Sequence, residues 1–212
     1  MKKYEFTGEV KVVFGITLHR IRAAVSFGAV VKGELGGWIE KKENLSQNGN
    51  AWVYGNAKVC GNAKVYGNAL VYGDAKVCGN AEVYGDAKVY GNAEVYGDAK
   101  VYGNALVYGD ALVYGDAWVC GNAWVCGNAE VYGDAKVYGD AKVCGNDDYI
   151  VFKNWWSSGR YFTWTRSNNK WRVGCFFGAG AELIEKAYKD SEQSGREYER
   201  VVKYVESILN EQ

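Results

Sequence analysis

The chain has 212 residues with 25 basic and 25 acidic side chains, so its formal net charge is zero. This balance excludes the general attraction to nucleic acids or anionic membranes that a strongly basic chain shows. No stretch approaches the roughly 20 consecutive apolar residues of a membrane-spanning helix. The first residues contain lysines without the apolar region of a signal peptide. We therefore expect a cytoplasmic protein that neither enters a membrane nor recognises a nucleic-acid sequence.

Residues 1–32 are expected to form an N-terminal β cap. Two stretches rich in β-forming residues, 4–13 and 16–24, meet at Phe14 and Gly15, which predicts two strands. Such a segment would cover the open end of the repeats that follow it. The only histidine of the chain, His19, lies here. We interpret it as a residue of the cap rather than as a catalytic base.

From Ala51 to Asn146 the sequence repeats the hexapeptide Ala-x-Val-Tyr/Cys-Gly-Asn/Asp sixteen times. A short fixed period indicates a solenoid, in which each repeat buries its apolar side chains against its neighbours. Alternation along a strand places Ala and Val on the inner face, and x and Tyr on the outer face. Gly followed by Asn or Asp tolerates the positive φ of a tight corner. Each repeat is therefore predicted to be a four-residue strand and a two-residue corner.

These repeats resemble the left-handed parallel β-helix of hexapeptide-repeat proteins over about residues 33–146. The resemblance implies a mainly β fold with three strands and eighteen residues per coil, and about six coils. Tyr or Cys stands where that family has a small or acidic residue, which predicts tyrosine ladders on the outside. The segment from Gly33 to Ala57 and the C-terminal region are similar to an uncharacterised family common in bacteriophages and anaerobic gut bacteria. This similarity implies a phage-related protein that works in the cytoplasm of a host cell.

With eighteen residues per coil, the outward x positions form three columns. One column collects four of the six apolar x residues, and an apolar stripe on a polar surface marks a docking surface. The candidate interaction face consists of Trp52, Leu70, Leu106, Trp118 and Trp124, of which Trp118 belongs to another column. Its partner would be a second subunit, the chain's own C-terminal module or another protein. Chance clustering is the alternative.

Five of the six cysteines replace Tyr in the repeats, and four of them are predicted to stack on adjacent coils within disulfide distance. These pairs are Cys60 with Cys78 and Cys126 with Cys144. We interpret them as thiols that are reduced or occasionally oxidised rather than as a metal site. One corner is predicted to carry stacked carboxylates, which we interpret as solvated turn residues rather than a cation site: Asp98, Asp116 and Asp134.

The period ends at Asn146, and residues 147–212 are predicted to form a β-β-β-α-α module. Three segments, 147–156, 159–167 and 170–178, indicate antiparallel strands separated by turns. Apolar residues at helical spacing predict two helices, over about 179–191 and 195–210. Ser194 and Gly195 would separate the helices, whose apolar stripe would pack on the sheet or, alternatively, dimerise.

The strands of this module combine arginines with aromatic rings, and residues 147–177 carry five basic against two acidic side chains. Such a face can stack bases and bind phosphates. The candidate binding residues for a ligand or partner are Arg160, Trp164, Arg166, Trp171 and Arg172. Alternation places Cys175 on the same face as Trp171 and Val173. The alternative is that most of the rings form the core against the helices.

No nucleophile triad, phosphate-binding loop, dinucleotide fingerprint or metal-ligand spacing occurs, so we expect no enzyme, no metal and no cofactor. The favoured function is a non-enzymatic binding or scaffold protein. It would engage a host protein or a nucleotide-type ligand, for example as an antagonist of host defence. One alternative is a structural β-solenoid that assembles with itself, and a homo-oligomer is expected. The other is a divergent hexapeptide acyltransferase that would use His19.

Overall fold

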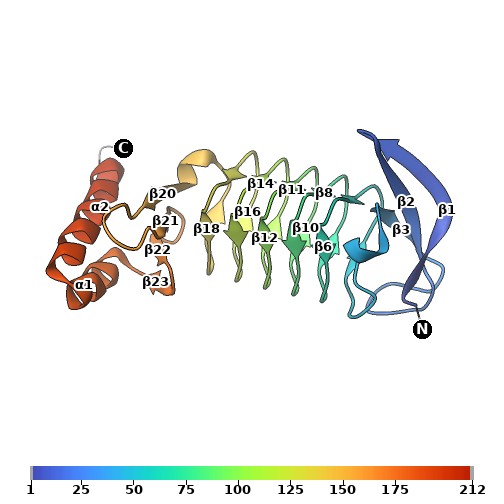
Figure 1. Cartoon of the computed structure of the whole chain (residues 1–212), viewed down its shortest axis with the longest axis horizontal. Coiled ribbons are helices and arrows are strands. Elements are labelled where there is room, and N and C mark those ends of the chain that lie inside the picture. The colour runs from blue at the N-terminus through green and yellow to red at the C-terminus, as the bar shows by residue number, and fades with distance from the viewer. Residues whose placement is uncertain (1, 211–212) are drawn as a thin grey trace. The chain divides into compact units, whose positions relative to one another are not determined.

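The computed structural model describes residues 2–210, and the chain divides into two compact units, Met1–Asn146 and Asp147–Gln212. The first unit contains a strand cap and a parallel β-solenoid, and the second contains an antiparallel sheet with two helices (Figure 1). The prediction of a mainly β fold with about six coils is confirmed. The expected cap and the solenoid belong to the same compact unit.

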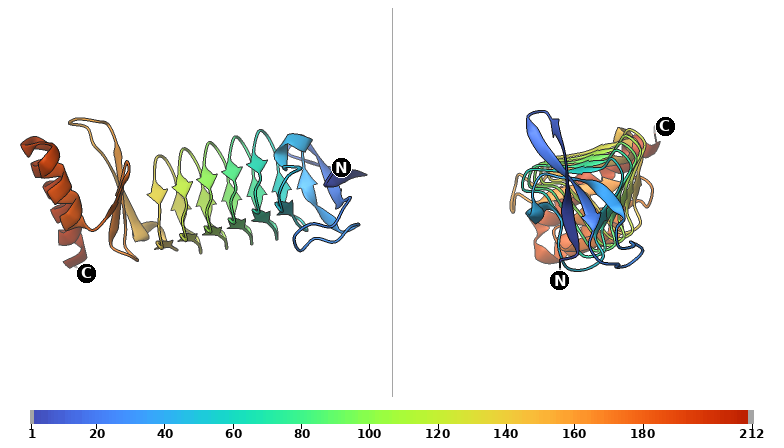
Figure 2. Two further views of the ribbon diagram at one scale, coloured as in Figure 1. Left: turned by 90° about the horizontal axis from the view of Figure 1, so that it is seen from below. Right: turned by 90° about the vertical axis from the view of Figure 1, so that its right-hand side faces the viewer.

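Three parallel sheets form the solenoid, and hydrogen-bonded neighbours in each sheet are eighteen residues apart (Figure 2). The first contains β4 (Trp52–Val53), β7 (Leu70–Val71), β10 (Lys88–Val89), β13 (Leu106–Val107), β16 (Trp124–Val125) and β19 (Lys142–Val143). The second contains β5 (Lys58–Val59), β8 (Lys76–Val77), β11 (Glu94–Val95), β14 (Leu112–Val113) and β17 (Glu130–Val131). The third contains β6 (Lys64–Val65), β9 (Glu82–Val83), β12 (Lys100–Val101), β15 (Trp118–Val119) and β18 (Lys136–Val137).

Each solenoid strand is two residues long rather than the expected four. The chain turns at a corner in every repeat, so that only the x residue and the valine keep strand pairing on both sides. The backbone ladder nevertheless reaches further, because the Lys88 nitrogen donates to the Ala105 oxygen at 2.9 Å and the Tyr90 nitrogen donates to the Val107 oxygen at 2.9 Å. Stacked coils are therefore joined along most of each repeat.

The interior of the solenoid consists of the repeated alanines and valines. All of them are fully buried, as Ala93 and Val95 illustrate with 0% exposure. Burying one such valine contributes roughly 1.5–3 kcal/mol before the loss of chain entropy is counted. The prediction that these two positions point inward is confirmed.

The outer surface of the solenoid carries ladders of like residues. The rings of Tyr72 and Tyr90 stack with centroids 4.8 Å apart, and those of Tyr90 and Tyr108 with centroids 4.9 Å apart. At a corner, the Asn68 side-chain amide donates to the Asp86 carboxylate of the next coil at 3.0 Å. The predicted tyrosine ladders are thus confirmed, and amide ladders add hydrogen bonds between the coils.

The cap consists of a hairpin of β1 (Tyr4–Val13) and β2 (Ile16–Ala23), and β3 (Leu35–Ile39) and a 3-10 turn, Lys42–Asn44, follow it at the start of the solenoid. The hairpin turns where expected, with positive φ at Phe14 and Gly15. Strand β3 pairs antiparallel with β2 and parallel with β5, so the cap continues one sheet of the solenoid. A Cβ on Gly36 would lie 2.6 Å from the Trp52 ring, which explains why a glycine occupies this position.

Unit 2 contains four strands, β20 (Tyr149–Lys153), β21 (Tyr161–Thr165), β22 (Lys170–Val173) and β23 (Phe176–Gly178). The third expected strand is divided because the chain turns at Gly174, whose φ is +55°. Cys175 is exposed at this turn, so its expected place on the face of Trp171 is wrong. The order is therefore β-β-β-β-α-α, and a 3-10 turn, Asn146–Asp148, precedes it.

Helices α1 (Gly180–Asp190) and α2 (Glu192–Asn210) form a hairpin. Gly195 lies within α2 and does not separate the helices as expected. A Cβ at this position would lie 2.2 Å from Cδ1 of Tyr188 on α1, so the glycine allows the two helices to approach closely.

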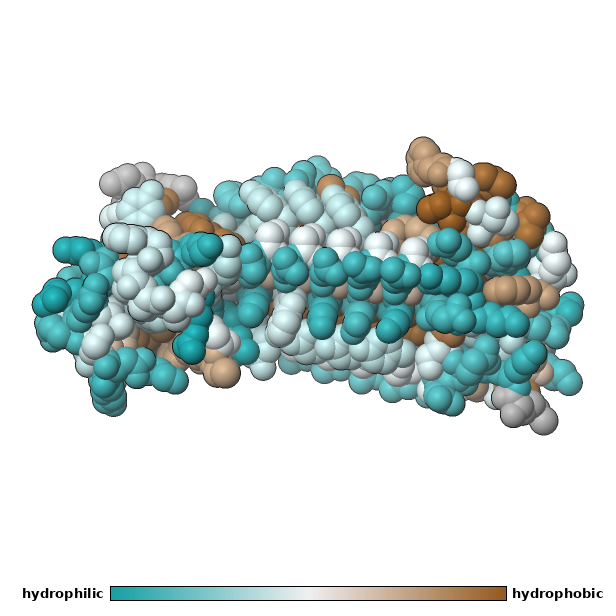
Figure 3. Space-filling view, in the orientation of Figure 1, coloured by the Kyte–Doolittle hydropathy of each residue, from teal (hydrophilic) through white to brown (hydrophobic). Residues whose placement is uncertain are grey.

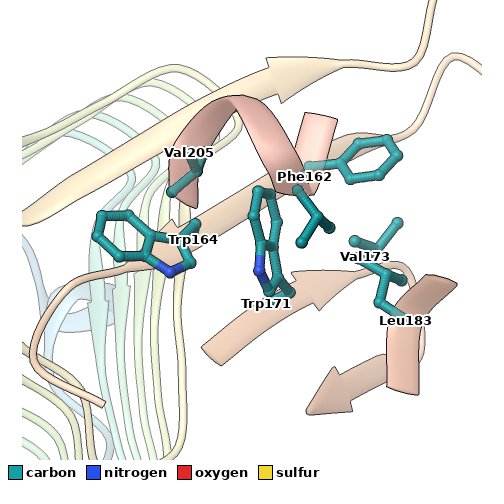
Figure 4. Packing of buried hydrophobic residues seen from close by; sticks show 7 residues of the cluster. Phe162, Trp164, Trp171, Val173, Leu183 and Val205 are labelled. Atoms are coloured by element: carbon teal, nitrogen blue, oxygen red, sulfur yellow. The ribbon is translucent and has the colours of Figure 1, made fainter. Parts of the chain in front are cut away.

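The core of unit 2 lies between the sheet and the helices (Figure 4). Cross-strand neighbours on β21 and β22 supply its aromatic part, since Phe162 pairs with Val173 and Trp164 with Trp171. The helices contribute buried side chains from the opposite side: Leu183, Val202 and Val205. The prediction that the apolar helix stripe packs on the sheet is therefore confirmed.

Candidate functional site

A cavity of about 270 Å³ opens beside the core of unit 2. It lies where the β22–β23 turn meets the two helices and is lined by Arg160, Val173, Cys175, Phe176, Leu183, Lys186, Ala187, Asp190 and Tyr198. Its apolar wall is continuous with the core, because Val173 and Leu183 belong to both (Figure 4). We call this cavity the helix–sheet pocket.

The helix–sheet pocket has a charged rim. Arg160 and Lys186 provide two cationic groups, and Asp190 provides one carboxylate. The Lys186 ammonium lies 5.9 Å from the centroid of the Phe176 ring, within the range of a cation–π contact. The pocket therefore combines excess positive charge with an aromatic and aliphatic wall, which suits an organic anion better than a cation.

The loop before β21 positions Arg160. Asn154 is fully buried, and its backbone nitrogen donates to the Arg160 oxygen at 2.7 Å. The Asn154 side-chain oxygen also accepts from the Ser157 nitrogen at 2.9 Å, so one side chain closes the turn between β20 and β21. The Arg160 side chain then lies against Gly174, where a Cβ would be 3.4 Å from its Cδ. The guanidinium is thus held beside the β22–β23 turn.

Tyr198 lines the pocket from α2. Its ring packs edge-on against Phe162 with centroids 4.6 Å apart. Burial raises the pKa of Tyr198, while a side-chain hydrogen bond with Asn154 and the positive charge of Arg160 work in the opposite direction. The hydroxyl therefore stays protonated at neutral pH and can donate a hydrogen bond to a bound acceptor.

The structure does not bring the five sequence-predicted binding residues together. Trp164 and Trp171 are 1% and 2% exposed, which agrees with the alternative that these rings form the core. Their ring faces are not available to a ligand. Arg172 pairs with Thr163 across the strands and therefore points to the other side of the sheet from Trp171. Arg166 follows the end of β21, and only Arg160 lines the pocket.

Sequence reasoning missed most of the pocket lining. Lys186 and Asp190 lie one turn apart on α1, which is a surface pattern of many helices. Phe176 was placed by alternation in a continuous strand, and the turn at Gly174 changes its surroundings. The glycine at position 174 is the one sequence signal that could have indicated the turn, because glycine readily adopts positive φ.

The predicted interaction face of the solenoid is only partly exposed. Trp52 is 0% exposed because the cap covers it, with the Phe27 ring at a centroid distance of 5.4 Å. Leu70, Leu106, Trp118 and Trp124 are half-buried. Lysines from the next coil lie over two of the rings, with the Lys136 ammonium 4.4 Å from Trp118 and the Lys142 ammonium 4.4 Å from Trp124. The column register is confirmed, and its use as an interaction face stays a prediction.

The stacked cysteines form disulfides, Cys60 with Cys78 and Cys126 with Cys144. Their Cα atoms are 4.7 Å and 4.4 Å apart, as the parallel register requires. The interpretation of these thiols as mainly reduced is therefore wrong for this structure. Cys120 is buried and outside both disulfides, and Cys175 is exposed.

The remaining candidate residues of the first unit are His19 and the stacked aspartates of one solenoid corner. The His19 ring stacks on Phe6 within the cap, with centroids 4.7 Å apart. Over residues 2–210, no group of three His, Cys, Asp or Glu side chains is arranged to hold a metal ion, and the corner of Asp98, Asp116 and Asp134 is no exception. Within the same residues, no helix combines the length and hydrophobicity that crossing a membrane requires.

The fold and the repeats define the class: this chain is a β-solenoid repeat protein. Three segments of its solenoid, residues 63–79, 99–115 and 107–121, are similar to the family described as the YdcK beta solenoid repeat. The match covers less than half of the chain and lies wholly within the repeats, so it concerns the scaffold and not the helix–sheet pocket. No match to a curated protein was found.

Proposed function

We propose that this protein is a non-enzymatic binding protein whose C-terminal unit holds a small organic anion in the helix–sheet pocket. The observation that supports this function is the placement of Arg160 and Lys186 beside the apolar wall of Phe176 and Leu183. Binding pockets typically combine a mostly apolar lining with a few polar groups that orient the ligand. The β-solenoid is the scaffold that the unit is attached to.

The ligand is a molecule with an anionic group and a flat or aliphatic body. Arg160 presents a planar fork of donors that matches a carboxylate or phosphate. Lys186 adds a second positive charge, and Tyr198 adds a neutral donor. The body of the ligand packs on Phe176, where ring stacking and burial contribute to affinity. A nucleotide-type molecule has both parts.

The target is a molecule of a host cell, and the protein acts by sequestering it as an antagonist of host defence. This part of the proposal is supported by the similarity of the Gly33–Ala57 segment and the C-terminal region to a phage-associated family. The pocket chemistry is consistent with it, because a nucleotide-type signal is an organic anion.

A thermal-shift screen of the full chain with nucleotides and other organic anions tests the ligand class. A ligand that binds only the folded protein raises the melting temperature, and the rise grows with the ratio of the free ligand concentration to the Kd. The rate of Cys175 alkylation then shows whether the ligand occupies the pocket, since Cys175 lines the pocket, is exposed and lies outside both disulfides. We expect the stabilising anion to slow alkylation of Cys175 in the wild type but not in an Arg160→Ala variant.

Two results would contradict the proposed function. One is a screen in which no anion stabilises the protein. The other is an anion that binds while Cys175 is alkylated at an unchanged rate, because its site would then lie elsewhere. An Arg200→Ala variant is the matched control, since it removes the same charge from an exposed position on α2 outside the pocket. In this variant the anion should slow the alkylation of Cys175 as in the wild type.

A further inference from the structure

The β1–β2 hairpin of the first unit exposes apolar side chains. Val10, Val12 and Phe14 are 54%, 68% and 94% exposed. Figure 3 shows hydrophobic side chains gathered at the end of the unit that carries this hairpin. The Lys11 ammonium lies 3.9 Å from the centroid of the Trp38 ring on the solenoid side. Val10 and Val12 therefore point to the opposite side, into solvent.

Strand β1 is also the edge of its sheet. Among the described residues, the order of the 8-stranded sheet begins β1, β2, β3, and no strand lies beyond β1. An edge strand presents backbone donors and acceptors to any strand that approaches. A bulge interrupts β1 between Phe6 and Val10, after which Val10 to Val13 pair regularly with β2. The exposed apolar residues thus lie on a regular, accessible strand edge.

We propose that a second copy of this chain docks on this edge, with the two β1 strands antiparallel about a two-fold axis through Val10. Addition of a strand to an open edge is a common mode of recognition. A two-fold interface uses the same surface on both subunits. The strand complements itself in charge, because this register places Glu9 of each copy directly opposite Lys11 of the other.

The charge pattern selects this register over its neighbour. Directly opposite residues of antiparallel strands point to the same side of the sheet. The two-fold axis of the dimer must therefore pass through a residue position, and the neighbouring register is reached by moving it to the next residue. Moving it from Val10 to Lys11 would place the two lysines opposite each other, and like charges directly opposite are unfavourable. With the axis at Val10, two Glu9–Lys11 pairs form and the two Val10 side chains meet on the solvent side.

The surroundings of Lys11 favour an added carboxylate. Burial, followed by the nearby positive charges of Lys58 and Arg20, lowers the pKa of Lys11, while Asp74 and Glu9 of its own chain raise it. The positive charges that face Lys11 therefore lower its pKa more than the acidic groups of its own chain raise it. Glu9 of a second copy would supply the missing negative charge on the same side of the sheet.

Sedimentation velocity of the full chain over two decades of concentration tests this dimer. A contact of one strand pair is small, so we expect association that weakens on dilution. A Glu9→Lys variant should remain monomeric at concentrations where the wild type dimerises. The double variant Glu9→Lys, Lys11→Glu should dimerise again. Glu206→Lys makes the same charge change on α2 and should behave like the wild type.

The dimer proposal is overturned if the wild type is monomeric throughout, if Glu9→Lys dimerises as readily as the wild type, or if the double variant does not recover. Cross-linking supplies a readout that does not depend on charge. In a Cys175→Ser background, Val10→Cys should form an intermolecular disulfide on oxidation, because directly opposite Cα atoms are about 4.5–5.5 Å apart. Thr17→Cys on β2 should not, and equal cross-linking of both variants would contradict the register.

Discussion

Gly91 and Gly109 lie at the same corner of adjacent coils, so close that a Cβ on Gly91 would be 3.0 Å from the backbone nitrogen of Gly109. The same spacing recurs along the solenoid, for example between Gly85 and Gly103. The repeated glycine therefore has two functions: it adopts a positive φ, and it lets the next corner approach. Only the first function is evident in a single repeat.

Replacing Gly91 with Ala should destabilise the solenoid for both reasons. The positive φ alone costs about 1–2 kcal/mol for a residue with a Cβ, and the contact with Gly109 adds to this. Gly133→Ala is the matched control, because Gly133 also has a positive φ but open space around its Cβ position. Urea unfolding followed by circular dichroism should show a larger loss of unfolding free energy for Gly91→Ala. Equal losses would mean that the corner contact contributes nothing.

The buried Lys3 should make the free energy of unfolding rise with pH, whereas a lysine in an ion pair would make it fall. Its side chain is 4% exposed, and its ammonium donates to the Ala51 oxygen at 2.9 Å. Burial lowers the pKa of Lys3 from 10.5 to about 8. Between these values the unfolded chain keeps the proton that the folded chain releases, so the free energy of unfolding rises with pH.

We therefore expect the wild type to gain stability between pH 8 and 10, by up to about 1.4 kcal/mol per pH unit for one proton. Urea midpoints at several pH values measure this slope. A Lys3→Met variant should show a smaller rise, whereas Lys2→Met, at an exposed position, should keep that of the wild type. An identical slope in Lys3→Met would show that Lys3 does not cause the pH dependence.

Gly195 controls the approach of α1 and α2 and hence the shape of the helix–sheet pocket. A Gly195→Ala variant places a methyl group against the Tyr188 ring, and overpacking of this kind typically costs about 1–3 kcal/mol. Thermal melting should show the loss, accompanied by faster alkylation of Cys175 as the helices separate. Ser194→Ala, on the preceding residue, should change neither. A Gly195→Ala variant as stable as the wild type would contradict the close helix contact.

The solenoid could be predicted from the sequence because its physical determinants are local and repeated. One hexapeptide specifies an inward valine, an outward tyrosine and a glycine corner, and the period then sets which residues stack. Thus the pairing of Trp52 with Leu70 across coils follows from counting. Burial of Trp52 could not be predicted, because the cap that covers it folds back from a distant part of the chain.

The candidate site was much less predictable, since it depends on how different elements meet. Alternation correctly grouped Trp171 with Val173 but could not decide whether that face meets water or helices. The turn at Gly174 then moved Cys175 and Phe176 to the pocket. Lys186 reaches the same place from α1, and no local pattern relates it to Arg160.

Isothermal titration calorimetry with the anion selected by the thermal screen measures the central claim directly. We expect the Arg160→Ala variant to bind at least about tenfold more weakly than the wild type, because a charge-assisted hydrogen bond contributes about 1.5–3 kcal/mol. Arg200→Ala removes the same charge from an exposed position on α2 outside the pocket and should bind like the wild type. Equal affinity of the Arg160→Ala variant and the wild type would contradict binding in the helix–sheet pocket.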